Sequence, residues 1–239
     1  VLVRAEARNA QTPAMWRALA AAGDLRPPEV RVVVLSGAGR SFSAGLDRAL
    51  IVGTGIEGEV GLVDMARMPA DELDATIAGI QQAFAWWREH AAVTVAAVHG
   101  HAVGAGFQLA LACDLLVVAS DAQLAMREPS LGLVPDLGGT HTLTAAVGYR
   151  RALEICATGR WVGAEEAVRL GVAQLAVDPS ELSGTVDDLV AALLAVPPGA
   201  LAATKRLLRD AGGRDLREQM TAERAEQAGR LAELARLLG

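Results

Sequence analysis

The chain has 239 residues, of which 52% are hydrophobic, and its 22 basic and 28 acidic residues give a formal net charge of −6. This composition excludes an intrinsically disordered chain, and the acidic balance argues against binding to nucleic acid or to an anionic membrane. The aromatic residues are four Trp, three Phe and one Tyr, so the core must be built mainly from Ala, Val and Leu. Lys205 is the only lysine, which excludes any mechanism that needs a catalytic lysine elsewhere.

The first half of the chain alternates helical and strand-like patterns. Thr12 and Pro13 have the residue types preferred at a helix N-cap and at the first helical position. The expected helices cover residues 12–23, 71–90 and 104–113, and the expected strands cover residues 30–35, 93–98, 115–119 and 123–126. The strand runs are continuously apolar rather than alternating. We therefore expect an α/β protein whose mainly parallel strands are covered on both faces.

Helical patterns dominate the second half of the chain. The expected helices cover residues 143–158, 164–170, 186–195, 198–211 and 214–238. The stretch from Arg40 to Met68 is rich in glycine and has no clear periodicity, which is typical of a mobile loop over a functional site. No internal repeat is visible.

No charged residue occurs from Ala91 to Cys113, a run of 23 residues that is long enough to span a bilayer. The run contains His99, His101 and Gln108, and Gly100 divides it into a strand-like and a helix-like half. Polar residues are costly in a membrane, so a buried strand followed by a buried helix explains the run better. We expect no membrane span.

The N-terminus does not resemble a signal peptide, because Arg4, Glu6 and Arg8 come early. Cys113 and Cys156 lie in apolar helical patterns without disulfide or metal spacing, as expected for small core residues in a reducing cytoplasm. The four histidines show no metal-binding spacing either. We therefore expect a cytoplasmic protein with no metal site.

Two glycine-rich segments each follow a predicted strand. The first is Ser-Phe-Ser-Ala-Gly-Leu-Asp over residues 41–47, and the second begins at His99 and leads into a predicted helix. Such turns expose backbone N–H groups, and a helix dipole adds positive potential there. Two turns of this kind brought together could bind one oxygen anion. The alternative is that the glycines only permit tight turns and close packing.

Gly100, Gly104 and Gly106 also match a glycine pattern of short-chain dehydrogenases, which bind nicotinamide cofactors. That fingerprint should follow the first strand of a βαβ unit, whereas here it falls near residue 100. The only tyrosine, Tyr149, has no lysine four residues on. This function is a remote alternative.

A loop after residue 126 contains two carboxylates, Glu128 and Asp136, among two prolines and three glycines. Carboxylates beside apolar residues can have raised pKa values and transfer protons. The alternatives are a solvated acid and, for Asp136, a cap on the following helix.

Five segments taken in order resemble the crotonase superfamily, the enoyl-CoA hydratases and isomerases, over nearly the whole chain. Each is short, but their order is specific. The matching segments are Arg-Asn-Ala at 8–10, Ser41 to Asp47, Ala97 to Asp114, Ala122 to Thr140, and Thr158 to Gly171.

The resemblance implies a ββα spiral core with a C-terminal helical trimerisation region, and an assembly that is a homotrimer or a dimer of trimers. We expect the acyl-CoA-binding core at residues 1–190 and the oligomerisation region at residues 191–239. The ligand implied is an acyl-CoA thioester, with coenzyme A as part of the substrate and no separate cofactor. The thioester carbonyl would lie between the backbone N–H groups of Ala44 and Ala105. The expected substrate-binding residues are Arg8, Gly45, Asp47, Gly104 and Lys205, and residues 48–68 would cover the acyl pocket.

Departures from the family pattern bear on the reaction. Hydratases resemble one another in having two glutamates, and here Gln108 replaces the first while Glu128 keeps the second. An amide cannot exchange a proton near neutral pH, so the pattern favours an enoyl-CoA isomerase with Glu128 as acid/base. Asp136 stands where some isomerases of this superfamily carry a second carboxylate. Enoyl-CoA hydratase activity, other crotonase chemistry such as thioester hydrolysis, and a catalytically silent acyl-CoA binder stay open.

Overall fold

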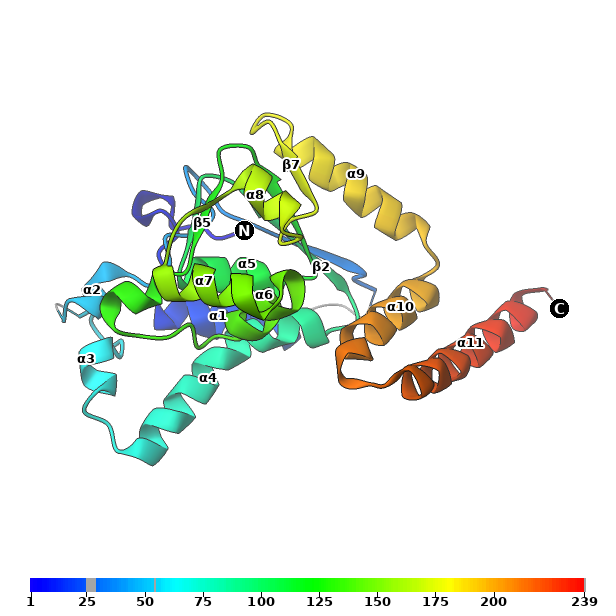
Figure 1. The fold of residues 1–239 in the computed structure, drawn as a ribbon, viewed down its shortest axis with the longest axis horizontal. Helices are drawn as coiled ribbons and strands as arrows, with labels where there is room; N and C mark the ends of the chain where they lie inside the picture. Colours follow the sequence, from blue (N-terminus) through cyan, green and yellow to red (C-terminus); the bar gives the residue numbers. More distant parts are fainter. Residues whose placement is uncertain (25–28, 54, 239) are drawn as a thin grey trace.

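A four-stranded parallel sheet forms the centre of the protein in the computed structural model, which describes residues 1–24, 29–53 and 55–238 (Figure 1). Its strands are β1 (Val32–Ser36), β2 (Val93–Val98), β4 (Leu115–Ala119) and β7 (Leu175–Val177), in the order β1-β2-β4-β7. All six residues of β2 are buried, which explains their continuous apolar sequence. The predicted parallel sheet is confirmed.

A second, smaller sheet is built from strands that lie between those of the first sheet along the chain. It contains β3 (His101–Val103), β5 (Gln123–Ala125) and β6 (Val162–Gly163), with β3 and β5 parallel and β6 antiparallel to β5. The chain passes from β2 to β3 and then into a helix, and from β4 to β5 and then into further helices. This repeated strand–strand–helix order is the expected ββα core.

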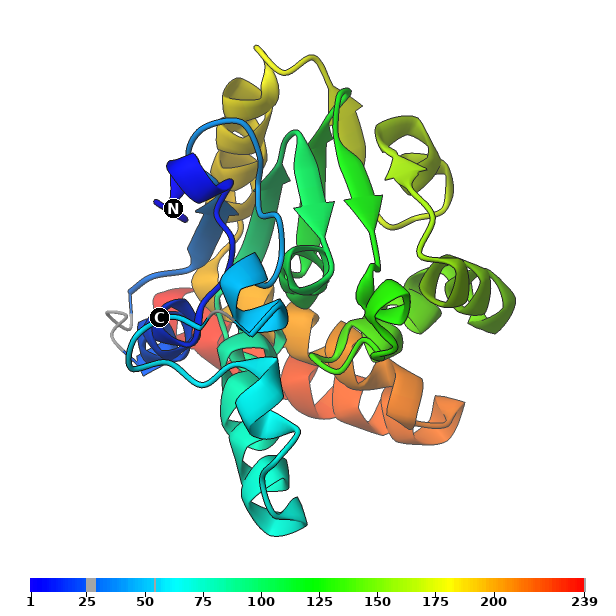
Figure 2. The same cartoon turned by 90° about the vertical axis from the view of Figure 1, so that its left-hand side faces the viewer.

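Helices cover both faces of the large sheet (Figure 2). One face packs on Leu182 and Val186, and the other packs on the buried helix that follows β3. The helices of the first 180 residues are α1 (Pro13–Asp24), α2 (Arg48–Ile51), α3 (Leu62–Met65), α4 (Ala70–Glu89), α5 (Ala105–Ala112), α6 (Gly139–Val147), α7 (Tyr149–Thr158) and α8 (Ala164–Arg169). The C-terminal helices are α9 (Leu182–Ala195), α10 (Pro198–Asp210) and α11 (Leu216–Leu238). Three short 3-10 helices cover Ala5–Ala7, Glu128–Leu131 and Ala211–Gly213.

The expected helix over residues 143–158 is wrong, because Gly148 ends α6 and begins α7. The expected irregular loop after Arg40 contains α2 and α3, and α2 begins where Asp47 accepts a hydrogen bond from the N–H of Ala49. At the start of α1, Thr12 accepts a hydrogen bond from the N–H of Met15, as the sequence predicts. The short strands β3, β6 and β7 were not expected, whereas the similarly short β5 matches the expected strand at 123–126.

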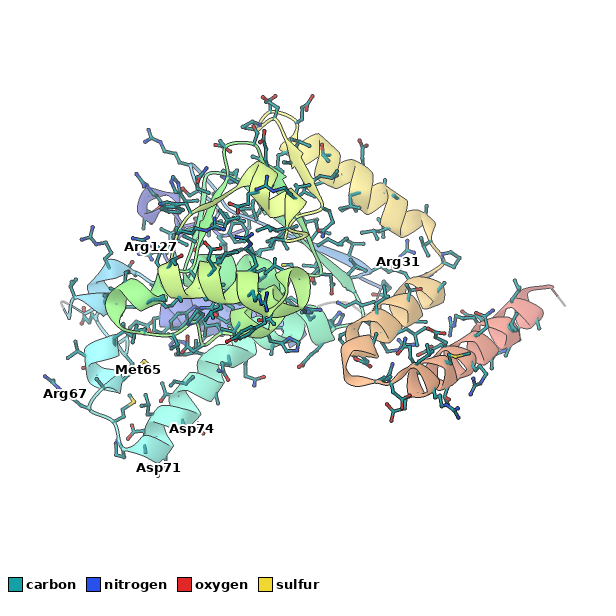
Figure 3. The ribbon with its side chains drawn as sticks, in the orientation of Figure 1. Arg31, Met65, Arg67, Asp71, Asp74 and Arg127 are labelled. Carbon is teal, nitrogen blue, oxygen red and sulfur yellow. The ribbon has the colours of Figure 1, made fainter. Side chains whose placement is uncertain are left out.

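Helix α9 covers one face of the large sheet, and α10 and α11 continue beyond the sheet on one side of the protein (Figure 1). Figure 3 shows Arg31 near the connection between α9 and α10, where its guanidinium donates to the carbonyls of Leu194 and Val196. Helix α11 packs against α10, where Arg206 pairs with Glu226 at 2.8 Å, and then extends away from the sheet (Figure 1). Among the described residues, no single helix is long and apolar enough to cross a membrane. The segments 182–195 and 198–213 reach that length and hydropathy only together, and they meet at 105°.

Candidate active site

The two glycine-rich turns of the sequence meet at the start of α5. The N–H of Ser43 donates to the carbonyl of His101 at 3.0 Å, and the N–H of Val103 donates back to the carbonyl of Ser43 at 3.0 Å. These bonds place the segment after β1 beside the strand that leads into α5. The expected convergence of the two turns is therefore present.

Gly45 and Gly104 make this approach possible. Gly45 has a φ of +81°, and a Cβ there would lie 2.3 Å from the carbonyl oxygen of Val103 and 3.6 Å from the nitrogen of Ala105. Gly104 has a φ of +52°, and a Cβ there would lie 3.3 Å from a carboxylate oxygen of Glu128. Side chains are strained at such φ values, so both glycines are required by the geometry. Gly45 allows its segment to approach the N–H of Ala105, and Gly104 allows the Glu128 carboxylate to approach the start of α5.

The N–H group of Ala44 is not free to bind an oxygen anion. It donates to the carbonyl of Arg8 at 2.9 Å, so the expectation for Ala44 is wrong in this structure. Two residues on, the N–H of Leu46 has no hydrogen-bond partner within the described chain. The N–H of Ala105, at the first position of α5, has none either among the residues described. The sequence could not identify Leu46, because the partner of a backbone N–H depends on how distant segments meet.

Gln108 is fixed between two parts of the site. Its amide oxygen accepts from the N–H of Leu137 at 2.9 Å and from that of Gly139 at 3.3 Å. Its amide nitrogen then donates to Oε1 of Glu128 at 2.7 Å. The side chain is buried, and the two backbone donors define which end of the amide faces Glu128. Gln108 is therefore a rigid, neutral hydrogen-bond donor to the carboxylate.

Glu128 begins the 3-10 helix that follows β5. Its Oε1 is held by Gln108, whereas its Oε2 is buried and has no hydrogen-bond partner in the described structure. Burial raises the pKa of Glu128, and the nearby negative charge of Asp136 raises it further, while the hydrogen bond from Gln108 opposes the rise. A carboxylate with one free oxygen and a raised pKa is suited to accept and return a proton.

Arg127 anchors the loop that carries Glu128. Its guanidinium donates to the carbonyl of Gly159 at 2.9 Å and lies 5.9 Å from the ring centroid of Trp161. Residues from α7 onward thus hold the start of the 3-10 helix in place. The anchor reduces the freedom of Glu128 to move relative to Gly104.

Asp136 lies on the same loop, before α6. Burial raises its pKa above the ordinary value for an aspartate. Its backbone carbonyl accepts a hydrogen bond from the side chain of Gln81 on α4 at 2.6 Å. The Asp136 side chain is exposed, and its negative charge contributes to the raised pKa of Glu128. A shared role of the two carboxylates in proton transfer stays a prediction.

The other predicted binding residues differ in their surroundings. Both carboxylate oxygens of Asp47 are engaged, Oδ1 by the N–H of Ala49 and Oδ2 by Arg4 at 2.9 Å, and these bonds lower its pKa. Asp47 therefore holds its own turn, and a contact with substrate stays a prediction. Arg8 is exposed and has a left-handed backbone with a φ of 51°. Its contact with a ligand also stays a prediction.

Lys205 is not available to bind a phosphate, so this expectation is wrong. Its side chain is 7% exposed, and its ammonium group donates to Asp114 at 2.7 Å and to the carbonyls of Trp87 and Ala92. Burial lowers the pKa of Lys205, while the bond to Asp114 opposes the change. Lys205 fastens α10 to the ends of α4 and β4. Within the described ranges, no group of His, Cys, Asp or Glu side chains could hold a metal ion.

A family model described as enoyl-CoA hydratase/isomerase matches residues 2–233. Among curated proteins, the carnitinyl-CoA dehydratase of Escherichia coli strain SMS-3-5 is 37% identical over 183 residues. This match covers 76% of the chain but 64% of the relative, so the chain spans less than two thirds of that protein's length.

Solved structures share the fold over almost the whole chain. A protein of Thermobifida fusca YX, provisionally named an enoyl-CoA hydratase, is 47% identical, with a TM-score of 0.92 over 98% of this chain and 88% of that one. The same protein in complex with acetoacetyl-CoA gives a TM-score of 0.91 and 47% identity, covering 96% of this chain and 89% of that one. An enoyl-CoA hydratase of Polaromonas sp. JS666 is 31% identical, with a TM-score of 0.84, covering 96% and 86%.

Proposed function

The chain belongs to the enoyl-CoA hydratase/isomerase family, and we propose that it shifts the double bond of an enoyl-CoA thioester with Glu128 as the proton carrier. The ligand class is supported by the Thermobifida fusca protein, which is solved in complex with acetoacetyl-CoA. Coenzyme A enters as part of the substrate, and the reaction needs no further cofactor. The observation that carries the proposal is the hydrogen bond from the Gln108 amide to Glu128.

The thioester carbonyl is held by the N–H groups of Leu46 and Ala105, which have no hydrogen-bond partner among the described residues. Negative charge develops on the carbonyl oxygen when a proton leaves the neighbouring carbon. A single fixed donor of this kind typically lowers such a barrier by about 3 kcal/mol. Ala105 opens α5, so the helix dipole adds to the stabilisation.

Glu128 removes a proton from the α-carbon of a 3-enoyl group through its free Oε2. The electron pair of the broken C–H bond spreads over the double bond and onto the carbonyl oxygen. The same proton then returns to the γ-carbon, which leaves the double bond between the α- and β-carbons. Asp136 is the second carboxylate that we propose for substrates in which the proton must return at a more distant carbon. No water is consumed in this sequence.

Hydration and dehydration form the second candidate reaction, favoured by the names of the relatives. Water addition needs one group to activate water and another to deliver the α-proton. Gln108 cannot fill either role, because its amide does not exchange protons near neutral pH. Hydration would therefore require one of Glu128 and Asp136 to activate water and the other to deliver the α-proton.

Substrate assays with the purified protein separate these reactions. Incubation with 3-enoyl-CoA in deuterated water should give 2-enoyl-CoA, with little 3-hydroxyacyl-CoA formed. Rapid hydration of 2-enoyl-CoA, exceeding the isomerisation rate, would contradict the isomerase proposal. Thioester hydrolysis would release free coenzyme A, and a silent binder would bind acyl-CoA in calorimetry but turn over no substrate.

We also propose that residues 191–239 form an oligomerisation region and that residues 1–190 form the acyl-CoA-binding core. The support is that α11 extends away from the sheet and exposes Leu216, Met220, Leu231 and Leu234 (Figure 1). Such residues are more stable when a second surface covers them. A homotrimer, or a dimer of trimers, can be tested by light scattering of the whole chain.

A further inference from the structure

A cavity of ≈ 740 Å³ is lined in part by Gln108, the residue whose amide donates to Glu128. It runs between α4, α5 and the start of α6, and Phe84, Ala112 and Leu137 supply apolar parts of its wall. Gln81 and Arg88, which also line it, are seven residues apart on α4, which corresponds to about 10 Å of helix. The cavity is therefore long enough for several methylene groups that extend from the reacting carbons.

The guanidinium of Arg88 lines this cavity and has no ion-pair partner among the described residues. Its side chain is half-buried, and its guanidinium donates only a long hydrogen bond of 3.4 Å to the hydroxyl of Thr142. Over the described parts of the chain, no carboxylate lies within ion-pair distance of Arg88. Taking a cation partly out of water without a counter-charge costs free energy.

The other charged or titratable side chains at the cavity are either paired or exposed, unlike Arg88. Arg209 lines the same wall, but its guanidinium is paired with Asp210 at 2.6 Å and donates to the backbone carbonyl of Glu89. The Glu89 side chain is exposed, so solvent screens its charge. His141 is also exposed at the cavity mouth. Arg88 is thus the unpaired cation best placed to meet a ligand that fills the cavity.

We propose that this cavity takes the distal part of the acyl group and that Arg88 binds a carboxylate at its far end. The substrate class is therefore an acyl-CoA whose chain ends in a carboxylate. An unsubstituted alkyl chain would fill the apolar wall but would leave the guanidinium without a counter-charge. This inference rests on the proposed function for the position of the thioester end. An arginine–carboxylate pair is short, directional and charge-assisted.

Binding of two non-reactive ligands tests the proposal independently of catalysis. The probes are saturated acyl-CoA thioesters of equal chain length that end either in a methyl group or in a carboxylate, measured by calorimetry. The wild type should bind the carboxylate form about tenfold more tightly than the methyl form, as expected for one charge-assisted hydrogen-bonded pair. Arg88→Met should abolish this preference, and Arg88→Lys should keep part of it.

Arg150→Met is the matched control, since Arg150 is exposed on α7 and its loss changes the net charge equally. The control should keep the wild-type preference. The proposal is overturned if the wild type binds both probes alike, or if Arg88→Met weakens both equally. It is also overturned if Arg88→Met changes the oligomeric mass and leaves the preference intact, because the cavity would then be a subunit contact. Isomerase activity can fail without affecting these binding results, so the two proposals are tested separately.

Discussion

The amide nitrogen of Gln108 lies 2.7 Å from Oε1 of Glu128, and the opposite end of the same amide is fixed by two backbone N–H groups. Glu128 is consequently left with one buried oxygen that has no partner among the described residues. Proton transfer through a single oxygen fixes the direction from which substrate must approach. It also explains why a neutral amide is useful at residue 108, since a second carboxylate would repel the first.

Glu128→Gln should reduce isomerisation by about 10²- to 10⁴-fold, because it removes the group that accepts and returns the proton. Affinity for a saturated acyl-CoA should change little, since the thioester carbonyl is held by backbone N–H groups. Steady-state kinetics and calorimetry measure the two effects. The exposed Glu165→Gln is the matched control and should keep full activity. Unchanged isomerisation in Glu128→Gln would remove this residue from the mechanism.

Gln108→Glu should lower isomerisation about tenfold and raise hydration of 2-enoyl-CoA. The new carboxylate cannot donate a hydrogen bond to Glu128 unless a proton lies between them, so the pKa of the pair rises. The acidic limb of the pH–rate profile should move to higher pH. Gln108→Met keeps a similar shape without the amide, and it should lower isomerisation without producing hydration. A Gln108→Glu variant with an unaltered pH profile would contradict the proposed contact.

The stability of the protein should depend on pH through Glu128. Burial raises the folded-state pKa of this group above its ordinary value of 4.5, so the folded state binds the proton more tightly than the unfolded chain does. The stabilising contribution is complete below pH 4.5 and is lost as the pH rises through the folded-state pKa. Relative to wild type, Glu128→Gln should therefore become more stable as the pH rises from about 4 to about 8. Urea denaturation at several pH values measures this difference, and a difference that does not vary with pH would contradict it.

Asp114→Ala should destabilise the fold by about 3 kcal/mol, because it leaves the buried ammonium group of Lys205 without its counter-charge. Chemical denaturation measures the free energy of unfolding. Asp187→Ala on the exposed surface of α9 is the control and should change stability by less than about 0.5 kcal/mol. Equal stability of the two variants would show that the Lys205 pair does not fasten α10.

Local sequence patterns predicted the elements whose pattern is long or continuous. The buried strand 93–98 and the helix that follows it were expected because both are apolar throughout. Glu128 was expected from its loop, and its burial agrees with the chemistry assigned to it. These features depend on residues that are neighbours in sequence.

Features that depend on distant contacts were not predictable in the same way. Nothing in the local sequence shows that the N–H of Ala44 is taken by the carbonyl of Arg8 while that of Leu46 is free. Lys205 was expected to bind substrate, but its ammonium group is buried and donates to Asp114, 91 residues away. The resemblance identified the family, which the family model confirms, and it misassigned these individual contacts.

The burial of Lys205 gives the protein a chemical reporter of its own. Lys205 supplies the only lysine ε-amine of the 239-residue sequence, and the folded structure hides this amine beneath α10. Amine-directed reagents should label position 205 only when α10 leaves the sheet. The rate of that labelling, read by mass spectrometry, would measure how often the C-terminal helices open.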